Sequence, residues 1–139
     1  MFLFMYWLVL RYTWDVTKCM FSTGNISEKL RIASLDCSEE TVVDLYAGIG
    51  YFVLPYLVHA KARHVHACEW NPHAIQALRK SLALNGVQDR CTIHEGDNRK
   101  VRMEFSYPYQ ELHLVLGQSV YTYHSILLYF CFTYYIPCH

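Results

Sequence analysis

Apolar and polar residues along the middle of this chain repeat in the order strand, helix, strand, helix, strand. Short runs rich in β-branched and other apolar residues predict strands at 41–46, 63–70 and 91–96. Strands that alternate with helices are typical of a parallel sheet with right-handed crossovers. The hydrophobic pattern therefore predicts an α/β fold.

The two helices between these strands have recognisable ends. The segment 51–60 predicts a helix that begins beside two glycines, with Pro55 tolerated in its first turn. In the second helix, Asn71 is suited to cap the N-terminus and Pro72 to occupy the first helical position. Gly86 is placed to end that helix, because glycine readily adopts the left-handed conformation required there.

The two ends of the chain differ in composition from the middle. Charged residues make up only 17% of the sequence and aromatic residues 16%, and the imbalance comes mainly from the ends. We therefore divide the chain into an atypical apolar N-terminus (1–11), a cofactor-binding α/β domain (12–102) and a divergent aromatic-rich tail (103–139). The tail is compatible with a membrane anchor, with core strands of the same domain, or with a non-native end from alternative splicing. Its polar residues disfavour a membrane span.

Charge and cysteine content bear on the partners, metal content and cell compartment of the protein. The 12 basic and 12 acidic side chains cancel, so net charge does not indicate a partner. The six cysteines show no spacing typical of a zinc site, and we expect no metal. Free thiols indicate a reducing, cytoplasmic compartment, and 139 residues are enough for one domain, which we expect to be a monomer.

Candidate ligand-binding residues follow each of the three predicted strands. Gly48 and Gly50 form a turn after the first strand, where a missing Cβ lets the backbone approach a ligand. Glu69 ends the second strand, nineteen residues after Gly50, where a carboxylate can accept both hydroxyls of a ribose. Asp97 and Asn98 follow the third strand and can offer an acceptor and a donor to an adenine edge. Each feature alone is compatible with an ordinary turn, but together they predict a nucleoside pocket.

The glycine turn lacks the third small residue of a dinucleotide-binding fingerprint. That fingerprint requires Gly or Ala at position 53, and this chain has Val53. A single nucleoside with a short charged appendage therefore fits better than a dinucleotide.

A further helix is predicted upstream of the first strand. Asn25 and Glu28 have the spacing of a capping box, and Leu30, Ile32 and Leu35 are apolar positions of that helix. Lys29 is unfavourable in a first turn, because a cation there opposes the helix dipole. It indicates an anionic partner such as a carboxylate, and the alternative is a solvated lysine.

Three segments together resemble the tRNA wybutosine-synthesising protein 2 family. They are YTWDVTKCMFSTGNISEKLR, VVDLYAGIGYF and HACEWNPHAIQALRKSLALNGVQDRCTIHEGDNRK, and they cover residues 12–100. The family is related to the Trm-five-type tRNA guanine methyltransferases. The resemblance implies a Rossmann-like S-adenosylmethionine-dependent transferase fold with a parallel sheet that is incomplete in this chain.

What the resemblance implies is transfer of the 3-amino-3-carboxypropyl group of S-adenosylmethionine to demethylwyosine in the anticodon loop of phenylalanine tRNA. By this resemblance Ser22 and Lys29 contact the amino-acid part of S-adenosylmethionine, and Glu69 contacts its ribose. Asp97 and Asn98 contact its adenine. The end of the first strand and the turn after it form the floor of the cofactor pocket, with Asp44, Ala47, Gly48 and Gly50. No general base is indicated.

The two ends of the chain do not match the family. Its members continue past the GDNRK segment with further strands and helices, and they carry upstream tRNA-binding regions. We therefore expect a truncated or alternatively spliced product whose catalytic activity is in question. Two alternatives remain: a tRNA guanine methyltransferase, and a non-catalytic truncated isoform, associated with a membrane through its tail.

Overall fold

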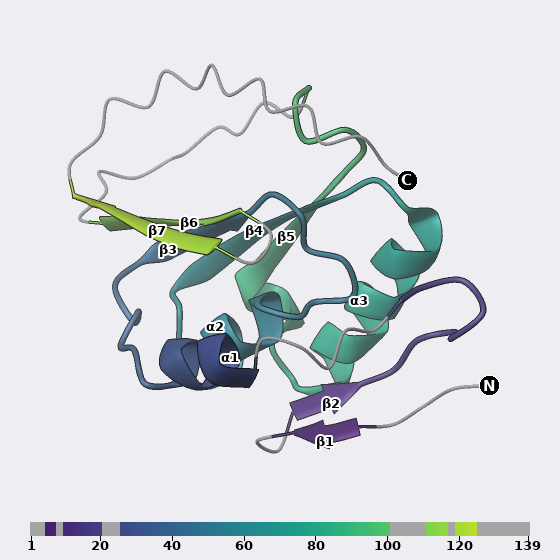
Figure 1. Cartoon of the computed structure of the whole chain (residues 1–139), viewed down its shortest axis with the longest axis horizontal. Coiled ribbons are helices and arrows are strands. Elements are labelled where there is room, and N and C mark those ends of the chain that lie inside the picture. The colour runs from purple at the N-terminus through teal and green to yellow at the C-terminus, as the bar shows by residue number, and fades with distance from the viewer. Residues whose placement is uncertain (1–4, 8–9, 21–25, 101–110, 117–118, 125–139) are drawn as a thin grey trace.

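The computed structural model describes residues 5–7, 10–20, 26–100, 111–116 and 119–124, with β1, β6 and β7 described by their backbone. In chain order the elements are β1 (Met5–Trp7), β2 (Leu10–Tyr12), α1 (Ile26–Ala33), β3 (Thr41–Asp44), α2 (Val53–Val58), β4 (His64–Glu69), α3 (Pro72–Leu84), the 3₁₀ helix η1 (Gln88–Arg90), β5 (Cys91–Glu95), β6 (Glu111–Leu116) and β7 (Ser119–His124) (Figure 1).

The main sheet has the strand order β5-β4-β3-β6-β7. Strands β5, β4, β3 and β6 are parallel neighbours, with Val42 opposite Val65 and Val65 opposite Cys91. Strand β7 is antiparallel to β6, an edge that the sequence pattern did not predict. The expected α/β fold with a parallel sheet is confirmed, and the carboxyl ends of β3, β4 and β5 meet at one edge of the sheet.

The three α-helices lie on the same face of this sheet (Figure 1). Right-handed crossovers that move in one direction, from β3 to β4 to β5, place α2 and α3 on the same side. Leu54 and Leu57 of α2 and Leu78 of α3 are buried against Val42 and Val65 of the strands. This layer holds the glycine turn between β3 and α2 in a fixed position.

The predicted ends of the helix after β4 are confirmed, whereas the helix predicted over 51–60 is shorter, at Val53–Val58, and the predicted cap Asn25 lies outside the described residues. Asn71 caps α3 by accepting a hydrogen bond from the backbone N–H of His73 at 3.0 Å, and Pro72 is the first residue of the helix. Gly86 has a φ of +67°, and its N–H donates to the carbonyl of Ala83. Val87 donates to the carbonyl of Leu82, so the helix ends in a Schellman motif.

Helix α1 buries Lys29 and Ile32. Leu30, another apolar residue of this helix, is 47% exposed. Lys29 is only 4% exposed, so the interpretation as a solvated lysine is wrong. Apolar spacing alone does not show which face of this helix is buried, because tertiary packing buries the lysine and leaves Leu30 on the surface.

The segment 10–20 is part of the folded core. Leu10, Tyr12 and Trp14 are buried in the same hydrophobic cluster as the strands and helices. The backbone N–H of Thr13 donates to the Ser81 hydroxyl of α3 at 3.2 Å. Core packing therefore begins upstream of position 12.

Part of the aromatic-rich segment 103–139 belongs to the main sheet, since β6 pairs with β3 along its length. This pairing favours the interpretation as core strands for 111–116 and 119–124, and residues 125–139 lie outside the described part of the chain. No helix within the described ranges is both long and apolar enough to cross a bilayer.

Candidate cofactor site

The turn after β3 is built around two glycines with positive φ. Gly48 has a φ of +55° and Gly50 a φ of +101°. A Cβ on Gly48 would lie 2.9 Å from the Tyr51 ring. The N–H of Ala47 donates to the carbonyl of Cys68 in β4 at 3.0 Å, and the N–H of Gly50 donates back to the carbonyl of Ala47 at 2.9 Å. A Cβ on Gly50 would lie 2.9 Å from the Leu78 side chain, so this turn requires glycine for both conformation and space at both positions.

The Glu69 side chain joins this turn to the end of β4. Its Oε2 accepts a hydrogen bond from the N–H of Gly48 at 2.8 Å. Its Oε1 accepts from the backbone N–H groups of Trp70 at 2.9 Å and Asn71 at 2.8 Å. A carboxylate offers about four acceptor positions, so one remains for a ligand hydroxyl. The structure thus brings Glu69 to the glycine turn, and its contact with a ribose stays a prediction.

The residues after β5 lie beside a shallow pocket of about 560 Å³, lined by residues 93–97 and Lys100. Asp97 accepts hydrogen bonds from the Arg99 side chain, which lowers the pKa of Asp97 to about 2. The Asn98 side chain donates from Nδ2 to the carbonyl of Leu45 at 2.6 Å, which ties this loop to the end of β3. Asp97 therefore lines the pocket, whereas Asn98 directs one donor toward β3. Their contacts with an adenine stay predictions.

Asp44 ends β3 and is almost fully buried, with 1% of its surface exposed. Its Oδ1 accepts from the N–H of Tyr46 at 3.0 Å, while its Oδ2 has no hydrogen-bond partner among the residues that the structure describes. Burial raises the pKa of Asp44 to about 7, the Tyr46 N–H opposes this shift, and the nearby charge of Glu69 adds to it. A buried carboxylate oxygen without a partner is suited to a ligand cation or donor.

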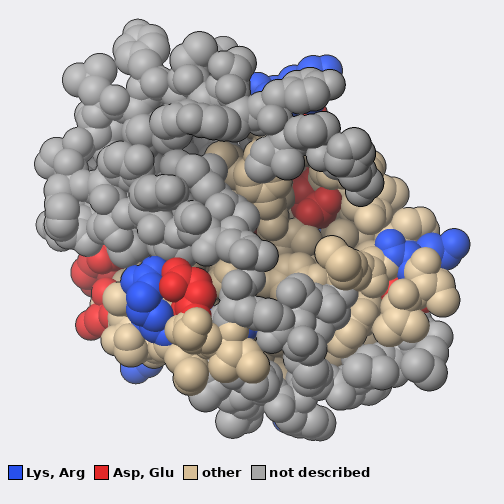
Figure 2. All heavy atoms as spheres, in the orientation of Figure 1, with Lys and Arg blue, Asp and Glu red and all other residues tan. Residues whose placement is uncertain are grey.

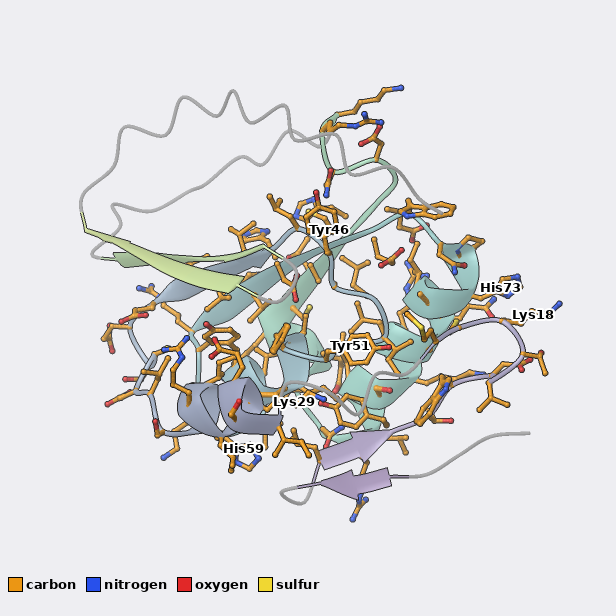
Figure 3. All side chains as sticks on the ribbon, viewed as in Figure 1. Lys18, Lys29, Tyr46, Tyr51, His59 and His73 are labelled. Atoms are coloured by element: carbon orange, nitrogen blue, oxygen red, sulfur yellow. The ribbon has the colours of Figure 1, made fainter. Side chains whose placement is uncertain are left out.

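Lys29 adds a buried cation to the site. Its ammonium nitrogen lies 5.4 Å from the centre of the Tyr51 ring, and burial lowers the pKa of Lys29 (Figure 3). A buried acid and a buried ammonium together suit a ligand that carries both an amino group and a carboxylate, as the amino-acid part of S-adenosylmethionine does. Ser22, the other residue predicted at this part, lies outside the described residues.

Three aromatic residues near the site were not predicted from the sequence as site residues. Tyr46 is 55% exposed at the end of β3, and Trp70 is 73% exposed at the end of β4. Tyr51 follows the glycine turn directly. The only signal for them in the sequence was that they lie next to or close to Asp44, Glu69 and Gly50.

Most of this chain matches the model of a known protein family. The family model described as the TRM5/TYW2 methyltransferase domain matches residues 9–127. This chain belongs to that family. The match begins before β2 and ends after β7, so it includes the segments 9–11 and 103–127 that lie outside our predicted α/β domain.

Relatives within the TRM5/TYW2 family include a tRNA wybutosine-synthesizing protein 2 homolog from Danio rerio. It is 72% identical over 94 residues, which are 68% of this chain and 23% of the relative. This chain therefore spans about a quarter of that relative's length.

Solved structures in the TRM5/TYW2 family have the same fold. The structure of M. jannaschii TYW2 in complex with AdoMet has a TM-score of 0.67 and 36% identity, covering 72% of this chain and 45% of that chain. The structure of P. horikoshii TYW2 in complex with MeSAdo has a TM-score of 0.62 and 40% identity, covering 67% of this chain and 35% of that chain.

Proposed function

We propose that this chain binds S-adenosylmethionine at the carboxyl ends of β3, β4 and β5. The observation that carries the proposal is the bond between Glu69 and the Gly48 N–H, which holds the glycine turn beside an acidic strand end. The pair of buried charges at Asp44 and Lys29 supports the same ligand, since its amino-acid part is zwitterionic. The AdoMet bound by M. jannaschii TYW2 adds support from a relative.

The reaction we propose is transfer of the 3-amino-3-carboxypropyl group to demethylwyosine in phenylalanine tRNA, as the family resemblance implies. The name of the Danio rerio relative, tRNA wybutosine-synthesizing protein 2 homolog, supports a role in wybutosine synthesis on tRNA. In this transfer the bond from sulfur to the carboxypropyl carbon breaks, its electron pair neutralises the sulfonium, a new bond forms to a carbon of the base, and that carbon loses a proton. The by-product is methylthioadenosine.

The task of this chain's residues is orientation. A sulfonium activates all three attached carbons, so the product depends on which carbon faces the base. In this proposal the buried Lys29 ammonium holds the ligand carboxylate, and the oxygen of Asp44 that has no partner among the described residues holds the ligand amino group. Glu69, which accepts from the Gly48 N–H, holds the ribose, so that the adenosine and the amino-acid chain are fixed from opposite ends.

We propose phenylalanine tRNA as the partner; the name of the Danio rerio relative supports a tRNA, and the family resemblance implies which one. On the face shown in Figure 2, the basic side chains of the described residues lie in separate groups and form no continuous patch.

The test is a pair of radiolabelled transfer assays with phenylalanine tRNA that carries demethylwyosine. S-adenosylmethionine is labelled in the methyl group in one assay and in the carboxypropyl chain in the other. We expect only the carboxypropyl label to reach the tRNA. Transfer of the methyl label alone would instead establish the methyltransferase alternative, and no transfer of either label would favour the non-catalytic isoform.

A further inference from the structure

Tyr46 and Trp70 are two exposed aromatic residues at the carboxyl edge of the main sheet. Tyr46 follows β3 and is 55% exposed, and Trp70 follows β4 and is 73% exposed. Each lies just beyond the acidic residue that ends its strand, and its backbone N–H donates to that carboxylate. Tyr46 donates to Asp44 at 3.0 Å, and Trp70 donates to Glu69 at 2.9 Å. The two rings therefore stand at equivalent places on neighbouring strands.

The backbone that carries Tyr46 is fixed on both sides of the residue. The carbonyl of Leu45 accepts a hydrogen bond from the Asn98 side chain at 2.6 Å. The N–H of Ala47 donates to the carbonyl of Cys68 in β4 at 3.0 Å. An exposed ring on a backbone that is held in this way loses little conformational freedom when a planar group binds to it. The ring of Tyr46 is thus a preorganised flat surface.

The strand order places Tyr46 at the reacting end of the proposed ligand. In the proposed orientation, S-adenosylmethionine lies across the ends of β5, β4 and β3, with its amino-acid part beside Asp44 of β3. The transferred carbon belongs to that part, so the acceptor base must come to the end of β3. Tyr46 is two residues past Asp44, whereas Trp70 stands one strand away. In Figure 3 Tyr46 lies apart from Lys29 and Tyr51, on a different part of the site.

We propose that Tyr46 stacks on the acceptor base of the tRNA. A carbon of an aromatic base attacks through its π electrons, so the transferred carbon approaches one face and the opposite face is available to the ring. Stacking requires only two flat faces, and the three fused rings of demethylwyosine offer a larger face than guanine does. The inference rests on the proposed function, because it assumes that the acceptor is a tRNA base. It adds the residue that holds this base and a reason for preferring the tricyclic one.

The test measures binding, so that it does not require turnover. An anticodon stem-loop of phenylalanine tRNA that carries demethylwyosine is titrated into the whole 139-residue chain with saturating S-adenosylhomocysteine, which has no sulfonium to transfer from. Tyr46→Leu removes the ring, and we expect the Kd for this stem-loop to rise about 10-fold. Tyr46→Phe keeps the ring and should stay within about 2-fold of the parent. S-adenosylmethionine should bind all of these chains within about 2-fold, which also shows that the variants fold.

Trp70→Leu is the matched control, because it removes an exposed ring one strand away and leaves the backbone N–H that donates to Glu69. We expect it to change the Kd for the stem-loop by less than about 2-fold. With guanosine at the target position, the loss caused by Tyr46→Leu should shrink to about 3-fold, because the stacked face is smaller.

Three results would overturn the stacking role. They are an unchanged Kd in Tyr46→Leu, an equal loss in Trp70→Leu, and a parent chain that binds S-adenosylmethionine but not the stem-loop. Weaker binding of S-adenosylmethionine by Tyr46→Leu would place the ring against the adenine and would also contradict the inference. If the parent chain did not bind S-adenosylmethionine, the proposed function would fail and this inference with it.

Discussion

Replacing Asp44 by Asn should remove a pH-dependent loss of stability. In the folded chain the pKa of Asp44 is about 7, against an ordinary value of 3.8, mainly because the side chain is buried. At 1.36 kcal/mol for each pH unit, ionised Asp44 costs the folded state about 4 kcal/mol above pH 7. Because the pKa of Asp44 is raised in the folded state, the folded chain has its full stability below pH 3.8, where Asp44 is neutral in both states. It loses this stability as the pH rises through 7.

The assay is urea unfolding of the parent and Asp44→Asn chains at a series of pH values. Asparagine stays neutral and can still accept from the Tyr46 N–H. The free energy of unfolding of the parent, minus that of the variant, should fall by about 3 kcal/mol between pH 5 and pH 8 and then level off. Asp36→Asn is the control, because hydrogen bonds from Ser38 lower the pKa of Asp36 and its difference curve should not fall. A difference for Asp44 that stays constant within about 0.5 kcal/mol would refute the reasoning.

Three further predictions concern the turn and the strand ends. Glu69→Gln should lower the free energy of unfolding by about 2–3 kcal/mol, because at least one charge-assisted bond to a backbone N–H is lost, and an unchanged thermal midpoint would contradict this. Gly86→Ala should cost about 1–2 kcal/mol for its positive φ alone. Gly50→Ala should cost more in the same unfolding assay, because its Cβ would also collide with the core, and equal costs would count against a packed turn. Asn98→Ala should destabilise the chain by about 1 kcal/mol by removing the donor to Leu45, which hydrogen exchange at the end of β3 would detect as faster exchange.

Local sequence signals predicted the elements of the fold well where those signals were strong. The cap at Asn71, Pro72 at the helix start and Gly86 after the helix end are properties of a few neighbouring residues, and the structure confirms all three. The glycine turn was also predictable, because its chemistry depends on the backbone alone.

What the sequence could not predict depends on contacts between distant residues. Lys29 is buried and Leu30 is exposed, because α1 is oriented by what it packs against and not by its own apolar pattern. The bond from Glu69 to Gly48 and the contacts of Tyr51 join segments far apart in the chain. Strands β6 and β7 are rich in residues also found in anchors, and their pairing in the sheet became visible only in three dimensions.

The most direct test of the central claim is thermal unfolding of the 139-residue chain with increasing S-adenosylmethionine. If the ends of β3, β4 and β5 form the pocket, the folded state should gain about 2.7 kcal/mol at a ligand concentration 100 times Kd, and the unfolding midpoint should rise with ligand concentration. The same titration of a Glu69→Ala chain should give a smaller rise. A parent chain whose midpoint does not move, or a variant that gains as much as the parent, would contradict the account.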